Sequence, residues 1–338
     1  MKEWIGRHHQ PAFRLRDREP APGPTDQGSS RFRFDAASMR LMWTAGGEDC
    51  TKQVYPLGLP GLGFDAPALI AEMDYCGVDV ALLNTDHTLG GNVEFLGACM
   101  RAYPERLVSM LPVEEWTIVN DPEAALLPLV RWRSEPGFRA IKFIPWYAYR
   151  HGVLDRWDGP AYATFWSGVA RLGLPVFFTL APHPDAADEV SGFIDELSML
   201  RAVMERHPEL CCSLTHGFPY RALLDGHRVA VPDAMWTAFE NPNLSLEVSF
   251  PVRVGDVFAF PYREVRPVVE EMCARVGPER LLWGSDMPFQ NRFCTYRQSR
   301  EWLELFLPPD VTAQVLGGSA ARVLDISGSH APAARKTF

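Results

Sequence analysis

The sequence predicts a (β/α)₈ barrel, and three observations indicate it. Eight short runs rich in apolar residues alternate along the chain with longer segments whose apolar residues recur at helical spacing. The ends of successive runs lie about 30–50 residues apart, the length of one strand, one helix and their loops. The runs lack strict apolar–polar alternation, so we expect a parallel sheet that is buried on both faces.

The expected strands follow one another from residue 32 to residue 286. They are FRFDA (32–36), DVALLNT (79–85), RLVSMLPV (106–113), FRAIKFIPW (138–146), LPVFFTL (174–180), LCCSLTHG (210–217), NLSLEVSF (243–250) and RLLWGSD (280–286). Helices are expected between them, as in APALIAEMDYCG (66–77), AYATFWSGVARLG (161–173) and RPVVEEMCARVG (266–277), because each of these segments closes on glycine. No Gly-x-Gly-x-x-Gly motif follows a strand, which favours the closed barrel over a dinucleotide-binding open sheet.

The two ends of the chain differ from the middle. Residues 1–30 are polar and finish in EPAPGPTDQGSS, which is typical of a flexible arm. The last residues, GSHAPAARKTF, have a similar composition. The sequence therefore predicts a flexible N-terminal arm over 1–30, a single barrel catalytic domain over 31–326 and a C-terminal tail over 327–338.

Composition excludes several classes of partner. The formal net charge of −9 argues against nucleic acid or an anionic membrane as the partner. The N-terminus lacks the apolar middle of a signal peptide, and no apolar run approaches the ~18 residues of a membrane span. Seven cysteines without a Cys-x-x-Cys pair suit reduced thiols. We expect a cytoplasmic protein that acts on a small molecule.

Polar residues at the C-terminal ends of the expected strands are the candidate site, because barrels of this kind carry their chemistry there. Asp286 ends the eighth run and His216 the sixth, so both are candidate catalytic residues. Basic and aromatic side chains nearby suit a flat carboxylic acid, since guanidinium groups pair with carboxylates and aromatic walls suit an apolar body. The predicted substrate-binding residues are Trp43, Lys142, Trp146, Tyr147, Arg253, Phe289 and Arg292.

Several segments resemble the amidohydrolase-related (family 2) barrels, which include aminocarboxymuconate-semialdehyde decarboxylase and the resorcylate-type decarboxylases. HPELCCSLTHGFP (207–219) is similar to strand six of that family, and VGPERLLWGSDMPF (276–289) is similar to strand eight. RLGLPVFFTL, GFRAIKFIP and VLGGSAARVLDI also look like family segments, so the resemblance covers roughly residues 30–326. It implies the barrel fold, a small organic acid as substrate and a homodimer.

The metal ligands that the resemblance implies are largely missing. Family members hold a zinc-like ion through a His-x-His or Glu-x-His pair on strand one, a His on strand five and the strand-eight Asp. Here the first three positions correspond to Ala37, Met39 and Thr179, which leaves only Asp286. Catalytic zinc sites use three protein ligands, so we expect no standard metal site and no cofactor. Zinc, manganese or iron is expected only through a non-standard set, namely Asp286, His216, His183 and His87.

The residues that remain predict acid–base catalysis. Asp286 would act as general base and His216 as general acid in the hydrolysis of an aromatic or unsaturated organic acid derivative, such as a lactone, ester or amide. Two alternatives stay open. One is a non-oxidative decarboxylase or another C–C lyase, as in the relatives that the resemblance names. The other is a non-catalytic relative that binds a ligand or a partner.

Overall fold

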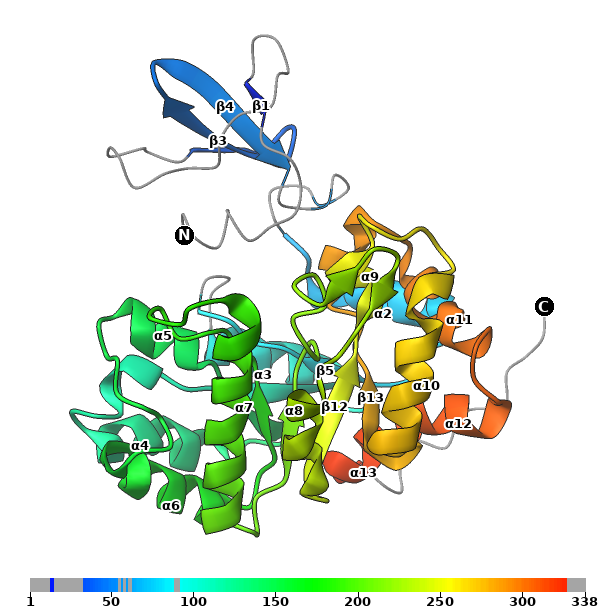
Figure 1. Ribbon diagram of the computed structural model, residues 1–338. Coiled ribbons are helices and arrows are strands. Elements are labelled where there is room, and N and C mark those ends of the chain that lie inside the picture. The colour runs from blue at the N-terminus through cyan, green and yellow to red at the C-terminus, as the bar shows by residue number, and fades with distance from the viewer. Residues whose placement is uncertain are drawn as a thin grey trace.

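The computed structural model describes residues 13–14, 33–53, 56, 59, 63–87 and 92–326 of the chain. Its centre is a curled sheet of seven parallel strands in the order β13-β12-β9-β8-β7-β6-β5 (Figure 1). The strands are β5 (Ala81–Leu83), β6 (Leu107–Pro112), β7 (Phe138–Phe143), β8 (Val176–Phe178), β9 (Cys212–Leu214), β12 (Leu244–Val248) and β13 (Leu281–Trp283). These are seven of the eight predicted strands, in the predicted sequence order, and the barrel architecture is confirmed.

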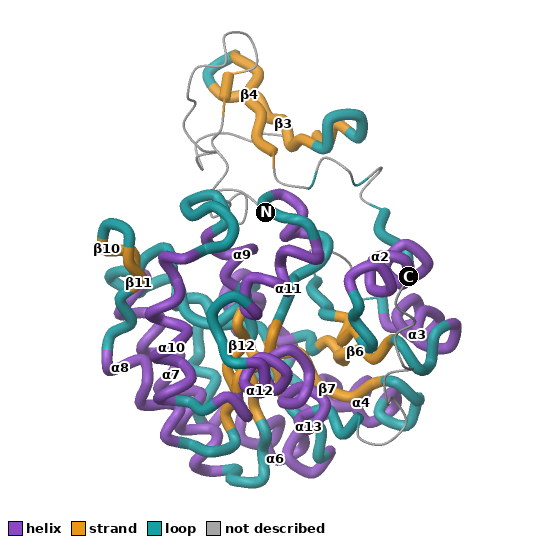
Figure 2. Tube along the Cα trace, turned by 90° about the vertical axis from the view of Figure 1, so that its right-hand side faces the viewer, coloured by secondary structure: helices purple, strands orange, loops and turns teal. Residues whose placement is uncertain are grey.

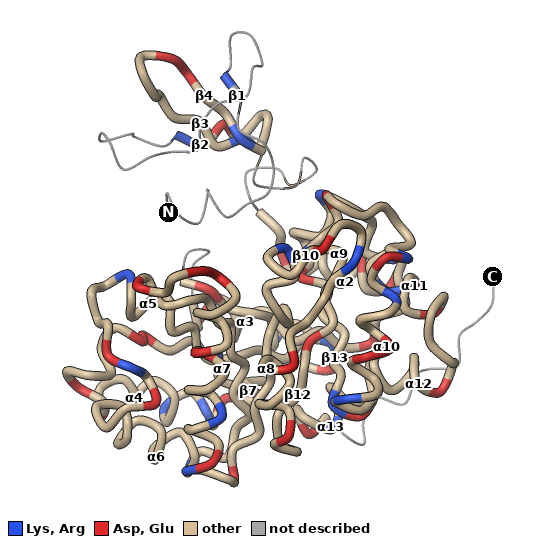
Figure 3. The backbone as a smooth tube through the Cα atoms, in the orientation of Figure 1, with Lys and Arg blue, Asp and Glu red and all other residues tan. Residues whose placement is uncertain are grey.

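Helices lie around this sheet (Figure 2). They are α2 (Ala66–Cys76), α3 (Val93–Ala102), α4 (Pro122–Trp132), α5 (Pro145–Arg150), α6 (Ala163–Leu172), α7 (Glu189–Arg206), α8 (Asp233–Trp236), α9 (Phe250–Val254), α10 (Arg266–Arg275), α11 (Tyr296–Glu304), α12 (Pro309–Ala313) and α13 (Ser319–Val323). Within the part of the chain that the structure describes, none of them has the length and apolar character needed to cross a bilayer. Acidic and basic residues are mixed around the barrel (Figure 3).

The expected first strand, residues 32–36, does not belong to the barrel. It forms β2 (Arg33–Asp35) of a separate antiparallel sheet with β3 (Arg40–Ala45), β4 (Glu48–Gln53) and β1 (Phe13–Arg14). Gly46 and Gly47, at φ of +59° and +81°, join β3 and β4 in a tight hairpin, and this local pairing determines where β2 lies. Figure 1 shows this sheet beyond the end of the barrel that carries α5 and α9.

This correction changes the meaning of two sequence positions. Ala37 and Met39 were predicted to occupy the metal-ligand positions of the first barrel strand, but they lie in the turn between β2 and β3. Their identity therefore says nothing about a barrel ligand. Most residues of the predicted arm over 1–30, and all of the tail over 327–338, lie outside the described residues.

The barrel has an inner and an outer apolar core. The inner core contains Val108, Met110, Ala140, Phe177 and Leu282 from β6, β7, β8 and β13, and Leu324, which follows α13, packs with them. The larger outer core lies between the sheet and the helices and is rich in aromatic side chains. Strands β6, β7, β8, β9 and β12 are thus buried on both faces, which explains why the sequence shows continuous apolar runs rather than alternation.

A buried carboxyl group anchors α5, the helix that follows β7 at the mouth of the barrel. Glu196 of α7 is fully buried and accepts hydrogen bonds from the Tyr149 hydroxyl at 2.6 Å and the Trp157 indole N–H at 2.8 Å. Burial raises the pKa of Glu196 to about 7. The Tyr149 bond holds α5, the helix that carries Trp146 and Tyr147, against α7, and the Trp157 bond holds the loop that follows α5.

Replacing Glu196 tests this anchor. Glu196→Leu leaves two buried donors without an acceptor and should lower the free energy of unfolding by about 2–4 kcal/mol in urea titrations, whereas Glu196→Gln should lower it less. The raised pKa means that the folded state holds a proton that the unfolded state has released. Wild-type stability should therefore fall relative to that of Glu196→Gln as pH rises through about 7. If the free energies of unfolding of wild type and Glu196→Gln changed in parallel with pH, this account of Glu196 would be contradicted.

Candidate active site

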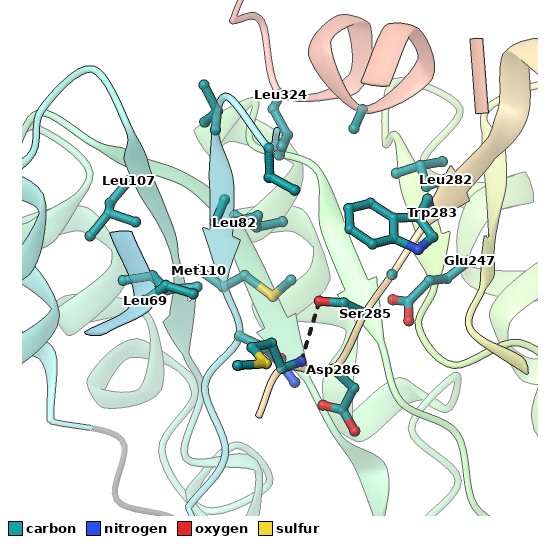
Figure 4. A pocket seen from close by; sticks show the side chains of 18 of the residues that line it. Leu69, Leu82, Leu107, Met110, Glu247, Leu282, Trp283, Ser285, Asp286 and Leu324 are labelled. Carbon is teal, nitrogen blue, oxygen red and sulfur yellow. Dashed lines mark hydrogen bonds between the residues drawn. The ribbon is translucent and has the colours of Figure 1, made fainter. Parts of the chain in front are cut away.

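The C-terminal ends of β5, β9, β12 and β13 line one cavity. His216 follows β9, Glu247 lies within β12, and Asp286 comes three residues after β13 ends. All three line a cavity of about 1060 Å³, together with Asp86 beyond β5 (Figure 4). The structure thus brings both predicted catalytic residues, Asp286 and His216, to the same cavity.

The imidazole of His216 is paired with a carboxylate that the sequence analysis did not assign. His216 Nδ1 lies 3.5 Å from Glu247 Oε1, and both side chains are largely buried. His216 has a φ of +65° and Gly217 a φ of +69°, so the chain turns sharply as it leaves β9. A Cβ atom at position 217 would lie 2.1 Å from the Tyr220 hydroxyl oxygen, and this turn therefore requires glycine.

Gly284 makes room for the same carboxylate. A Cβ atom at position 284 would lie 2.2 Å from Glu247 Oε1, so no other residue fits there without displacing the side chain. Beyond it, Asp286 has a φ of +53°, and its carbonyl oxygen accepts the Phe289 N–H at 2.7 Å. The Gly-Ser-Asp sequence thus ends β13 in a turn and places two carboxylates at the mouth.

Lys142 supplies a buried positive charge close to these carboxylates. Its side chain is 2% exposed, and Nζ donates a hydrogen bond to Thr215 Oγ1 at 3.0 Å. Burial lowers the pKa of Lys142 to about 8, although Glu247, Asp86 and Asp286 all act to raise it. Lys142 is therefore a group whose charge can change near neutral pH.

Charge around Glu247 and Asp286 is balanced by cations. Burial alone would raise the pKa of Glu247, but the neighbouring His216 and Lys142 outweigh it and hold that pKa below its usual value. Burial lowers the pKa of Arg253 on α9 and of Arg292 on η7 (Phe289–Arg292), while Asp286 opposes the shift in both. Two guanidinium groups thus lie within electrostatic range of Asp286.

Of the other predicted substrate-binding residues, Phe289 and Tyr147 lie at or beside the cavity, whereas Trp146 and Trp43 do not line it. Phe289 lines the cavity, and the Tyr147 hydroxyl donates a hydrogen bond to Asp86 Oδ1, which also lines it. Trp146 lies on α5 under the guanidinium of Arg150, whose central carbon is 4.8 Å from the ring centroid. Trp43 lies on β3 in the antiparallel sheet and is buried there, so the structure does not bring it to the cavity.

The non-standard metal set is not brought together. His87 Nε2 lies 2.6 Å from the Val113 carbonyl oxygen and 3.7 Å from Glu115 Oε2, on the β6 side of the mouth. The His183 ring accepts the Asp185 N–H at 3.2 Å within its own loop and packs against Tyr149. Among residues 33–53, 63–87 and 92–326, no three His, Cys, Asp or Glu side chains gather closely enough to hold a metal ion. These donors do not fit the zinc-like ion of the family.

Sequence reasoning placed Glu247 and Asp86 at strand ends but gave neither a role in catalysis or substrate binding. Glu247 interrupts the apolar run LSLEV, and a carboxylate in the middle of a buried strand was the available signal. Asp86 follows directly on the predicted run 79–85, three residues beyond the end of β5, a position that the barrel rule does point to. Their pairing with His216 and Tyr147 depends on strands far apart in sequence, and no local pattern reveals it.

The fold resembles that of known enzymes. A probable 2-pyrone-4,6-dicarboxylic acid hydrolase from Acinetobacter baumannii, solved with citric acid bound, superposes with a TM-score of 0.59 and 16% identity over 81% of this chain and 95% of that one. The 5-carboxyvanillate decarboxylase of Sphingomonas paucimobilis gives a TM-score of 0.53 and 18% identity over 76% and 82%. A zinc-bound amidohydrolase from Burkholderia multivorans gives 0.57 and 19% over 78% and 88%. Identities this low show a shared fold only.

A family-level match goes further than these superpositions. No curated protein matches the chain. The sequence model described as "Amidohydrolase" matches residues 92–326, more than half of the chain and the part that contains Lys142, His216, Glu247 and Asp286. The chain belongs to the amidohydrolase family of enzymes.

Proposed function

We propose that this protein hydrolyses a lactone, ester or amide of a small aromatic or unsaturated organic acid. The observation that carries the proposal is the His216–Glu247 pair, which shares one cavity with Asp286 and lies close to the buried ammonium of Lys142. A carboxylate, an oriented imidazole and a fixed cation are the groups that acyl transfer to water requires.

Each group has a distinct role in this mechanism. Asp286 removes a proton from water, and the resulting hydroxide attacks the substrate carbonyl carbon. The Lys142 ammonium stabilises the negative charge that develops on the carbonyl oxygen. The carbon–oxygen or carbon–nitrogen bond to the leaving group then breaks, and His216 gives that group a proton from Nε2. Glu247 keeps the ring oriented because its carboxylate lies beside Nδ1.

The cations near the mouth support an acidic substrate. Arg253 and Arg292 lie within range of Asp286, and Arg292 Nε is fixed by a hydrogen bond to the Phe289 carbonyl oxygen at 3.1 Å. A guanidinium group that is held in place loses little entropy when it binds a carboxylate. Phe289 offers an apolar wall at the cavity. Every step of this mechanism is assigned to the side chains of the described residues.

A non-oxidative decarboxylase is the second candidate, because the structure also resembles 5-carboxyvanillate and 2,6-dihydroxybenzoate decarboxylases. In that reaction the proton donor would protonate the ring carbon as carbon dioxide leaves. Dihydrocoumarin and 2-pyrone-4,6-dicarboxylate serve as hydrolysis probes, and 5-carboxyvanillate and 2,6-dihydroxybenzoate as decarboxylation probes. Ring opening without carbon dioxide supports the hydrolase, whereas carbon dioxide release from the benzoates contradicts it.

We also propose that the protein is a cytoplasmic homodimer. All seven cysteines are free, which suits a reducing compartment such as the cytoplasm. We infer a homodimer from the family, and gel filtration with light scattering tests it.

Removing either proposed proton-transfer group should slow the reaction strongly. Asp286→Asn and His216→Ala should each lower kcat/KM by about 10²-fold or more, since general acid–base groups contribute that much. Asp225→Asn and His227→Ala change the same residue types in the exposed β10–β11 hairpin (Leu224–Asp225 and Arg228–Val229) and should leave the rate unchanged. Wild-type rates in either site variant would remove that residue from the mechanism.

The rate should also depend on the protonation of Lys142. Because burial lowers the pKa of Lys142 to about 8, the ammonium loses its proton as pH rises through that value, and kcat should fall with a midpoint near it. Lys142→Met should remove this alkaline limb and lower the maximal rate, as measured in pH profiles from 6 to 10. If kcat of Lys142→Met still fell at alkaline pH with the same midpoint, a group other than Lys142 would be responsible for that fall.

A further inference from the structure

The seven-stranded sheet is open between β5 and β13. Within the described residues, β5 pairs only with β6, and β13 only with β12. The Ala81 and Gly284 N–H groups point toward those neighbours and donate to backbone carbonyl oxygens there, at 2.9 Å and 3.2 Å. Successive N–H groups of a strand point to opposite sides. The N–H groups of Leu82 and Trp283 therefore face the gap.

The cavity of the candidate active site extends along this gap. Residues 80–86 and residues 282–288 line it without a break in either run. Side chains alternate between the two faces of a sheet, so an unbroken run lines one cavity only where that cavity follows the backbone edge. Figure 4 shows Leu82 on one side of the cavity and Leu282 and Trp283 on the other. The cavity thus includes an elongated slot between two strand edges.

The slot has polar side chains at one end and apolar side chains along its walls. Asp86 and Asp286 lie at the end where β5 and β13 reach the mouth. Met110 lines the slot from the inner core, whereas Leu69 of α2 and Leu96 of α3 line it from the outer core. An extended chain in the slot would therefore meet apolar surface on both of its faces and backbone N–H groups on both of its edges.

We propose that the slot binds the amine half of an amide substrate, as an extended peptide-like chain antiparallel to β5 and β13. This assignment rests on the proposed function, in which the bond that breaks lies at the mouth between Asp286 and His216. Arg253 and Arg292 serve the carboxylate of the acid half, so the amine half is the part that extends into the slot. Because the acid caps its N-terminus, the chain runs from mouth to foot, opposite to the two strands.

The two strand edges favour a chain that carries amide groups. One peptide carbonyl oxygen can accept the Leu82 N–H, and that of an adjacent residue, which points to the other side, can accept the Trp283 N–H. An alkyl chain of the same length would cover both N–H groups and give neither an acceptor, which costs free energy. Adjacent peptide side chains would pack toward Met110 and toward Leu69 in turn, so apolar residues are expected at successive positions.

The reaction is hydrolysis of the amide that joins the two halves. Asp286 takes a proton from water, the oxygen bonds to the carbonyl carbon, the carbon–nitrogen bond breaks, and His216 protonates the leaving amine. The products are the free acid and a peptide with a free N-terminus. Four peptide residues would extend about 14 Å into the slot, within the ~23 Å that seven residues of strand edge span.

Two probes with the same scissile amide distinguish a peptide from an alkyl chain. Both carry a 3-carboxybenzoyl group, one on the peptide Leu-Val-Leu-Ala amide and the other on dodecylamine. Release of the amine should show a kcat/KM for the peptide that is about tenfold higher or more, because only the peptide gains hydrogen bonds to the edges. An equal or higher kcat/KM for the dodecyl amide would overturn the proposal.

The substitution Leu82→Pro tests the β5 edge and leaves its pairing with β6 in place. The N–H that is lost faces the slot, and proline is tolerated on edge strands. The dissociation constant of the peptide probe should rise about fivefold or more, whereas that of the dodecyl amide should stay unchanged. Equal effects of Leu82→Pro on both probes would contradict an edge hydrogen bond to the peptide.

Binding measured without turnover separates this inference from the proposed function. A peptide probe with a methylene group in place of the scissile carbonyl cannot be hydrolysed. At saturation it should slow hydrogen exchange of the Leu82 and Trp283 amides in the wild-type protein by about tenfold or more. If 3-carboxy-N-propylbenzamide is hydrolysed while exchange at both amides is unchanged, the slot assignment is wrong and the proposed function stands. Protection of both amides without hydrolysis of any probe supports the slot and contradicts the proposed function.

Discussion

The Glu247 carboxylate lies against the backbone of Gly284, and the mouth of the barrel depends on that contact. A side chain at position 284 would occupy the space of Glu247 Oε1, which a Cβ atom would approach to 2.2 Å. With glycine there, Glu247 can extend from β12 to within 3.5 Å of His216 Nδ1, which follows the neighbouring strand β9. The same Gly-Ser-Asp turn then places Asp286 on the cavity wall. One missing side chain thus allows three strands to contribute to one site.

Electrostatic balance follows from the same arrangement. Glu247, Asp86, Asp286 and Glu115 all act on Lys142, whose ammonium is buried among them. Burying the negative charge of any one of these carboxylates away from water costs free energy. The buried Lys142 ammonium offsets part of that cost for several carboxylates at once. Lys142 therefore has a structural reason to be charged as well as a proposed chemical one. Its lowered pKa shows that burial still exceeds the attraction of its neighbours.

Much of the fold was predictable because strands buried on both faces leave a continuous apolar signal. The runs at 79–85, 106–113 and 243–250 each contain a barrel strand, and the Asp65 cap and Gly77 define the ends of α2. The run at 32–36 misled the prediction. Composition alone cannot distinguish a short apolar strand of a hairpin from one of a barrel, and the Gly46–Gly47 turn that decides the matter lies ten residues further on.

The site was only partly predictable, for a related reason. Asp286 and His216 stand at strand ends and carry local motifs, so their positions followed from the barrel rule. The pairing of His216 with Glu247 joins residues from β9 and β12, and spacing along the chain does not encode it. Trp43 was assigned to the mouth because its segment was taken for part of the barrel, and the error in the first strand carried over to the site.

A double-mutant cycle on His216 and Glu247 tests the central claim most directly. Glu247 is held to act through His216, so kcat/KM of the variant carrying both His216→Ala and Glu247→Gln should equal that of His216→Ala alone. Once the imidazole is gone, its orienting carboxylate has nothing left to position. If the two substitutions instead multiply their effects on kcat/KM, Glu247 acts independently of His216, and the paired acid–base site described above is wrong.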